Sequence, residues 1–275
     1  MHSGLDSGGH YENFPVASWV LPPRFRVPVQ LIYAFARAAD DFADEGDVAD
    51  EVRLARLHEF TQELDRIESE QPSALPLFQK LGPMIRQHRL PIGLFRDLLS
   101  AFSQDVTTKR YGNFAELLDY CRRSANPVGR LLLHLYGETA PRSFAYSDGI
   151  CTSLQLINFL QDVPIDWSKG RIYLPQDELA RYGIDEQQIS ASRSGESWSA
   201  LMRYQAERAG NMLKAGAPLG RVLKGRLGLE LRMIVAGGQR ILEKLRDADG
   251  DVFRHRPVLK KADWLLMLLR ALKGS

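Results

Sequence analysis

Two segments of this chain place carboxylates inside sequences that are otherwise apolar and helix-forming. The first, residues 33–44, is rich in alanine and contains no glycine or proline, which favours an α-helix. Asp44 follows Asp40 by four residues and Asp41 by three, so the three carboxylates crowd one patch. Like charges at this spacing destabilise a helix, so we expect an offsetting partner such as a divalent cation. A solvated acidic face is the alternative.

The second segment, residues 155–166, likewise carries acidic and polar side chains along one helix face. We call each of these two arrangements an acidic stripe. Asn158, Asp162 and Asp166 are spaced by four residues, so they share one helix face, and the residues between them are largely apolar. Two buried helices of this kind can face each other across a cavity. Their oxygen ligands suit Mg²⁺, which takes one or two carboxylates per ion and completes its shell with waters and substrate phosphates.

Pro164 interrupts this second stripe. It has no backbone N–H, so inside a helix it should leave the carbonyl of Leu160 unpaired and kink the chain. Either the helix ends before Asp166, or Asp166 is aimed differently from a regular helical neighbour of Asp162. The sequence leaves both interpretations open.

The periodicity elsewhere predicts a single all-α domain. No alternating strand pattern or internal repeat is present, and the predicted helices are long enough to enclose a central cavity. We expect helices to begin at Pro28 and to run without interruption over residues 143–166 and 219–245. Residues 1–10 are small and polar and predict a disordered tail, which leaves residues 11–275 as the domain.

Composition narrows the class of protein further. The hydrophobic fraction of 44% and the charged fraction of 25% are ordinary for a globular chain, and a net charge of +2 gives no argument for nucleic acid. Two cysteines are too few for a disulfide framework, which fits a reducing, cytoplasmic location. No apolar run is long enough for a membrane span. Residues 264–269 are apolar and flanked by lysine and arginine, so they predict either a last core helix or peripheral contact with a membrane.

Several cations accompany the acidic stripes. Arg37 precedes Asp40 and Asp41 by three and four residues, so it can brace the carboxylates, contact a phosphate, or form an ordinary ion pair. Lys169 and Arg171 follow the second stripe, where they can clamp a diphosphate leaving group. A solvated turn is the better interpretation for Lys169, whereas apolar neighbours anchor Arg171.

Aromatic residues near both stripes can line the cavity. Tyr33, Tyr120, Phe14 and Phe159 offer ring faces that would stabilise a carbocation. Plain core packing is the stronger interpretation for each residue taken alone. The six histidines show no paired metal spacing, and no glycine-rich phosphate loop is present.

These motifs resemble those of the squalene/phytoene synthase family of head-to-head prenyl synthases. The matching residues are Tyr33-x-x-x-Arg37-x-x-Asp40-Asp41-x-x-Asp44, Asn158-x-x-x-Asp162-x-x-x-Asp166 and Gly170-Arg171-Ile172-Tyr173-Leu174-Pro175. The likeness runs from about Glu12 to the C-terminus. It implies an isoprenoid synthase fold, two or three Mg²⁺ ions and no NADPH.

Within the family, three segments look closest to the bacterial hydroxysqualene synthases of the hopanoid pathway. They are residues 12–18, 38–46 and 124–130. That subgroup implies a carbon–oxygen lyase that converts presqualene diphosphate and water to hydroxysqualene and diphosphate. The alternatives are a prenyltransferase that makes presqualene diphosphate, squalene or phytoene, and a non-enzymatic acidic helical module that binds a partner.

The resemblance and the motifs together predict the following roles. The metal ligands are Asp40, Asp41, Asp44, Asp162 and Asp166. The catalytic residues are Tyr33, Arg37, Asn158, Arg171 and Tyr173, with Tyr173 or Asn158 holding a water. The substrate-binding residues are Phe14, Tyr120, Lys169 and Arg171. The expected partner is a small prenyl diphosphate, handed over by a presqualene diphosphate synthase.

Overall fold

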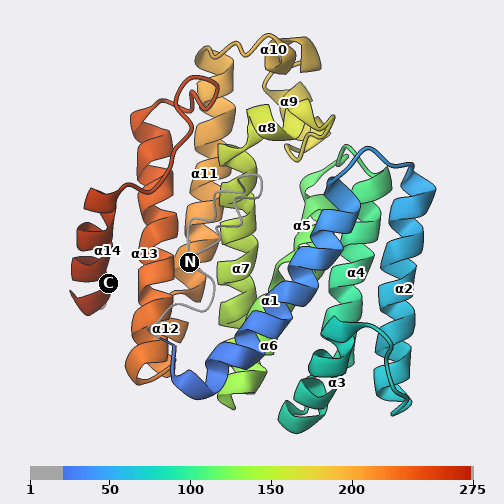
Figure 1. Cartoon of the computed structure of the whole chain (residues 1–275). Coiled ribbons are helices and arrows are strands. Elements are labelled where there is room, and N and C mark those ends of the chain that lie inside the picture. Colours follow the sequence, from blue (N-terminus) through green and yellow to red (C-terminus); the bar gives the residue numbers. More distant parts are fainter. Residues whose placement is uncertain (1–20, 274–275) are drawn as a thin grey trace, which may run out of the picture.

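The computed structural model describes residues 21–273, and the regular secondary structure of this part of the chain consists of helices joined by turns and loops. It contains no β-strand, only a β-bridge between Arg110 and Ile172, so the predicted all-α class is confirmed. The long helices lie side by side, and three short ones, α8 to α10, gather at one end (Figure 1). The helices are α1 (Pro23–Asp44), α2 (Asp50–Glu68), α3 (Pro76–His88), α4 (Ile92–Thr107), α5 (Phe114–Ser124), α6 (Asn126–Tyr136), α7 (Pro141–Gln161), α8 (Val163–Ser168), α9 (Gln176–Arg181), α10 (Glu186–Ser190), α11 (Glu196–Gly216), α12 (Leu219–Val222), α13 (Gly225–Asp247) and α14 (Lys261–Lys273).

Proline marks the start of several helices. Pro23, Pro76 and Pro141 each lie in the first turn of a helix, where the missing N–H needs no partner. Helix α1 therefore begins at Pro23 rather than at the predicted Pro28, which lies inside the helix. The predicted tail, residues 1–10, lies outside the described residues.

Two helices that were predicted to be continuous are broken. The predicted helix over 143–166 ends at Gln161, and a separate helix starts at Val163 with Pro164 in its first turn, so the missing N–H is accommodated. The predicted helix over 219–245 is interrupted after Val222, because Gly225 adopts a positive φ of 64° at the turn.

Helices α1 and α7 belong to different hydrophobic cores. Phe35 of α1 packs edge-on against Phe78 and Phe95, whose ring centroids lie 5.9 and 5.2 Å away, within a core built by α1 to α4 and part of α6. Helix α7 packs against α11 so closely that a Cβ on Gly216 would lie 2.5 Å from the carbonyl oxygen of Tyr146. The space between the two cores is where the cavities described below occur.

The last helix is attached through a buried carboxylate. Asp263 accepts hydrogen bonds from Arg240 Nε at 2.8 Å, Lys244 Nζ at 2.6 Å and the backbone N–H of Lys260 at 2.6 Å. Burial alone would raise the pKa of Asp263, but these donors outweigh burial and hold the pKa well below its usual value. This cluster fixes the start of α14 against α13.

We expect Asp263→Asn to lower the free energy of unfolding by about 3 kcal/mol at pH 7, because two cations lose their shared buried partner. Since the folded-state pKa is depressed, the contribution should be present above the unfolded pKa near 3.8 and be lost as pH falls below it. Urea denaturation at pH 7 and at lower pH measures both effects. Asp249→Asn, which removes an exposed ion pair with Arg203, should change stability by less than about 0.5 kcal/mol.

Candidate active site

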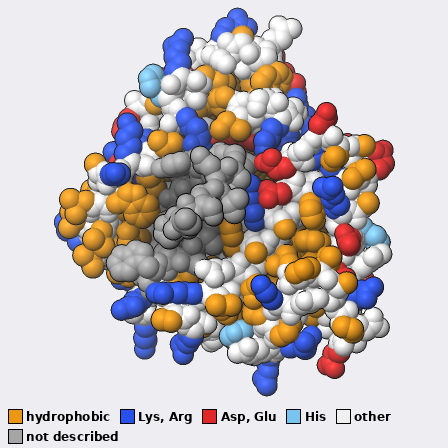
Figure 2. Space-filling view, viewed as in Figure 1, with side chains coloured by type: hydrophobic (Ala, Val, Ile, Leu, Met, Phe, Trp, Pro, Cys, Tyr) orange, Lys and Arg blue, Asp and Glu red, His pale blue; other side chains and the backbone are white. Residues whose placement is uncertain are grey.

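A cavity of about 470 Å³ lies where the C-terminal end of α1 meets the junction between α7 and α8. Figure 2 shows acidic and basic side chains together beside this end of α1. The lining of the cavity is acidic on two sides and cationic or aromatic elsewhere. The lining residues are Asp40, Asp44, Glu45, Asp105, Tyr120, Gln155, Asn158, Phe159, Asp162, Ile165, Asp166, Lys169, Arg171, Tyr173 and Arg256.

The two acidic stripes predicted from the sequence face this same cavity. Asp40 and Asp44 reach it from α1, and Asn158, Asp162 and Asp166 reach it from the α7–α8 junction. The break at Pro164 does not remove Asp166, because its backbone N–H still donates to the carbonyl of Asp162 at 2.8 Å. The helix does end early, and Asp166 nevertheless remains in the stripe.

Crowding and burial make two of these carboxylates resist ionisation. Burial, followed by the charges of Asp44 and Asp105, raises the pKa of Asp40 to about 7. Burial and the charge of Asp162 raise the pKa of Asp166 to about 8. The cavity therefore concentrates more negative charge than the protein neutralises, and an added cation would relieve it.

Asp44 is the carboxylate that the protein does neutralise. It pairs with Arg171 Nη1 at 2.6 Å and with Lys169 Nζ at 2.9 Å. Burial would raise its pKa, but the charges and hydrogen bonds of these two cations outweigh burial and lower it. The pairs tie α1 to the turn after α8, so they hold the two stripes in one site.

Arg256 is a site residue that sequence reasoning missed. It lies between α13 and α14, and its Nε approaches Asp162 Oδ1 to 2.6 Å. Only the tertiary fold brings this residue to the cavity, and no local pattern distinguishes it from other surface arginines.

Asp105 is the second missed residue. It is buried, with 3% of its surface exposed, and accepts hydrogen bonds from the hydroxyls of Tyr120 at 2.7 Å and Tyr173 at 3.1 Å. Burial raises its pKa to about 6, although Tyr120 and Arg171 oppose the rise. A single carboxylate on the apolar face of α4 was the signal that could have found it.

Aromatic rings form one wall of the cavity. The rings of Phe159 and Tyr173 stack with centroids 3.9 Å apart, and Tyr120 lies 5.8 Å from Tyr173. These rings surround the carboxylate of Asp105, so a polar group projects from an otherwise apolar wall.

A second cavity, of about 300 Å³, lies along the earlier turns of the same two helices. It is lined by aliphatic side chains of α1, α6, α7, α12 and α13, including Ile32, Leu132, Leu154, Leu223 and Leu231. Tyr33, predicted as a catalytic residue, lines this apolar cavity rather than the acidic one. Helices α1 and α7 thus line both cavities, the charged one near one end and the apolar one further along.

Two other predicted site residues, Arg37 and Asp41, do not line the acidic cavity. Arg37 pairs with Asp41 at 2.8 Å. Phe14 lies outside the described residues. Within residues 21–273, no three His, Cys, Asp or Glu side chains converge closely enough to hold a metal ion by themselves.

The facing acidic stripes and the helical fold define an isoprenoid synthase. The chain belongs to the squalene/phytoene synthase family, whose model matches residues 8–263.

Individual relatives agree with this assignment. The chain is 37% identical to a hydroxysqualene synthase from Rhodopseudomonas palustris over 86% of this chain and 80% of that one. It is 32% identical to a phytoene synthase from Mycobacterium tuberculosis over 75% and 68% of the two chains. The crystal structure of squalene synthase HpnC from Alicyclobacillus acidocaldarius matches with a TM-score of 0.80 and 33% identity, over 87% and 90% of the two chains.

None of the helices within residues 21–273 combines the length and the apolar character needed to cross a bilayer.

The opposite pKa shifts of two site carboxylates predict opposite effects on stability. In metal-free buffer at pH 9, Asp166→Asn should raise the free energy of unfolding by about 1–3 kcal/mol, because it removes a buried charge. The gain should vanish below the unfolded pKa near 3.8 and grow as pH rises toward the folded pKa of about 8.

Asp44→Asn is the matched control, since Asp44 is paired with two cations and its pKa is lowered. It should destabilise the protein at pH 9. Chemical denaturation of the three proteins measures these changes, and destabilisation by Asp166→Asn at every pH would contradict the argument.

Proposed function

We propose that this enzyme is a hydroxysqualene synthase, which converts presqualene diphosphate and water to hydroxysqualene and diphosphate. The observation that carries the proposal is the placement of a charged cavity and an apolar cavity along the same two helices. Such a site suits a ligand with a diphosphate head and a long hydrocarbon body. The 37% identity to a relative named hydroxysqualene synthase supports this activity among those of the family.

Four carboxylates are suited to hold Mg²⁺: Asp40 and Asp44 on one side, and Asp162 and Asp166 on the other. They supply only oxygen donors, and the raised pKa values of Asp40 and Asp166 indicate uncompensated negative charge. Bound Mg²⁺ supplies positive charge that stabilises a departing diphosphate.

The chain contributes further positive charge to the diphosphate. Lys169, Arg171 and Arg256 all line the cavity, on the same side as the second acidic stripe. They pair with Asp44 and Asp162, and their N–H groups are suited to bind phosphate oxygens as well. Cleavage of the carbon–oxygen bond then leaves a carbocation in the substrate and both bonding electrons on the diphosphate.

The walls protect the carbocation. The stacked rings of Phe159 and Tyr173 present π-faces that stabilise positive charge, and the apolar cavity excludes bulk water while the carbon skeleton rearranges.

Asp105 is placed to complete the reaction. When water adds to the carbocation, its oxygen forms the new carbon–oxygen bond and one proton must leave. The Asp105 carboxylate lines the cavity beside Tyr120 and Tyr173, so it is suited to accept that proton. Tyr173 is favoured over Asn158 as the residue that holds the water, because the Tyr173 hydroxyl contacts Asp105.

The direct test incubates purified protein with presqualene diphosphate and Mg²⁺, without NADPH, and identifies the lipid formed. We expect hydroxysqualene, with EDTA abolishing turnover. Asp162→Asn should lower kcat at least about 100-fold, because it removes a carboxylate that faces the diphosphate site. Asp41→Asn is the control and should retain most activity, since Asp41 does not line the cavity.

Other products would identify the alternatives. Formation of presqualene diphosphate or phytoene from simpler prenyl diphosphates would assign a prenyltransferase, and squalene formed only with NADPH would assign a reductive synthase. Near-normal turnover by Asp162→Asn would reject the metal site.

A second prediction separates ionisation from water capture. Asp105→Asn should lower the yield of hydroxysqualene at least about tenfold and raise the share of unhydroxylated hydrocarbons, because diphosphate can leave but the water loses its base. Product ratios by gas chromatography measure the change. Asp119→Asn, on the exposed face of the neighbouring helix, is the control. An unchanged product ratio would remove Asp105 from the capture step.

A further inference from the structure

The C-terminal helix α14 is covered on one face only. Met267 and Ala271 are buried against the rest of the protein. The opposite face carries leucines spaced as one helical stripe, with exposed fractions of 65% at Leu265, 50% at Leu269 and 63% at Leu272. Leucines exposed to this degree on one stripe indicate a contact surface rather than scattered surface residues.

The surroundings of this stripe are cationic. Lys260, Lys261 and Lys273 are exposed, and the single acid in residues 260–273 is Asp263, which is buried in its ion pairs. The stripe therefore has positive charge near both ends and no free carboxylate in its own helix.

Helix α12 is linked to the end of α14. Arg232 joins the two helices, because its Nε donates to the carbonyl of Ala271 at 2.7 Å and its Nη1 to the carbonyl of Gly220 at 2.6 Å. Residues 219–226 contain no acid, and their exposed side chains are Arg221, Val222, Lys224 and Arg226. Together the exposed residues of α14 and of residues 219–226 form what we call the α12/α14 surface.

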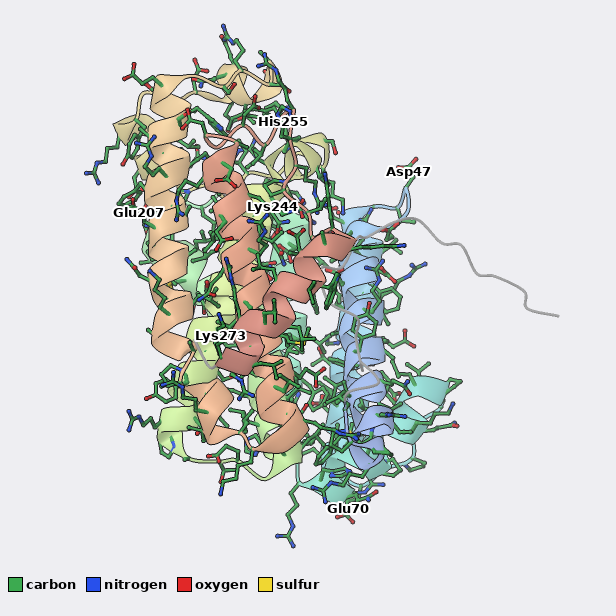
Figure 3. The ribbon with its side chains drawn as sticks, turned by 90° about the vertical axis from the view of Figure 1, so that its left-hand side faces the viewer. Asp47, Glu70, Glu207, Lys244, His255 and Lys273 are labelled. Carbon is green, nitrogen blue, oxygen red and sulfur yellow. The ribbon has the colours of Figure 1, made fainter. Side chains whose placement is uncertain are left out.

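This surface lies next to the apolar cavity. Leu219 and Leu223, in and directly after α12, line that cavity, so the same short segment carries cavity lining and surface cations. Figure 3 looks onto this side of the molecule, with α14 crossing in front and Lys273 at its end. Figure 2 shows the hydrophobic side chains over α14 bordered by lysine and arginine.

We propose that the α12/α14 surface docks the enzyme onto an anionic lipid bilayer. An amphipathic helix with exposed leucines and bordering lysines lies in the headgroup region of such membranes, where leucines enter the acyl layer and cations meet lipid phosphates. A second copy of the chain fits less well, because two such surfaces would bring their cations together. The proposal deepens the proposed function, since it gives a water-insoluble product a route from the apolar cavity into lipid.

The test measures co-sedimentation of the full-length protein with phosphatidylcholine vesicles, with and without phosphatidylglycerol. We expect binding only to the anionic vesicles, and weaker binding as salt increases. The variant Leu265→Asp/Leu269→Asp should lower the bound fraction at least about tenfold. Val52→Asp, at an exposed apolar position on α2, is the matched control and should bind normally.

The charge reversal Lys261→Glu/Lys273→Glu tests the surface without altering its leucines, so it remains informative if the leucine variant fails to fold. It should also lower binding at least about tenfold, whereas Lys80→Glu on α3 should not. Equal binding by all variants, or no binding by the unmodified protein, would falsify the proposal. So would a dimer in solution that Leu265→Asp/Leu269→Asp converts to a monomer.

Turnover with substrate dispersed in detergent separates this proposal from the proposed function. Both surface variants should keep near-normal turnover there and lose it only with substrate in anionic vesicles. Absence of turnover by the unmodified protein in detergent would count against the proposed function. The vesicle-binding measurements would still test whether the α12/α14 surface docks onto lipid.

Discussion

The active-site cavity depends on holding several carboxylates close together, although their burial and mutual repulsion oppose this arrangement. Asp40 and Asp44 lie in the last turns of α1, so the partial negative charge of that helix end adds to their repulsion. Burial adds a further cost, visible in the raised pKa values of Asp40 and Asp166. The pairs of Asp44 with Arg171 and Lys169 offset part of it. The remaining charge is what makes the cavity suited to cations.

Such an arrangement needs rigid support, and the two cores provide it. Helix α1 is fixed by the aromatic cluster around Phe35, and α7 is fixed by its close approach to α11 at Gly216. Because each stripe is attached to its own core, neither helix can relax away from the other without disrupting well-packed side chains. The same separation leaves room for the apolar cavity further along the helices.

The sequence was sufficient to predict the fold class and the two stripes, because a helical period of acids in an apolar background is a local signal. It could not place Arg256, which reaches the cavity only through tertiary packing, and its one signal for Asp105 was a single carboxylate on the apolar face of α4. It also could not decide the effect of Pro164: the helix ends, yet a new one starts at once and returns Asp166 to the site. Arg37 and Asp41 share the helix of the first stripe and pair with each other, but neither lines the cavity, and spacing alone does not fix this rotation of the helix.

The distribution of polar groups separates two parts of the proposed chemistry. The four metal-suited carboxylates and three cations surround the position for the diphosphate, so they govern ionisation. Asp105 differs from these groups in its hydrogen bonds, because two tyrosine hydroxyls of the aromatic wall donate to its carboxylate, while Arg171 donates to its backbone carbonyl. A carbocation formed in this cavity can be captured by water only where a water can be held and a proton accepted. We therefore expect the aromatic wall around Asp105, rather than the acidic stripes, to decide which product leaves the enzyme.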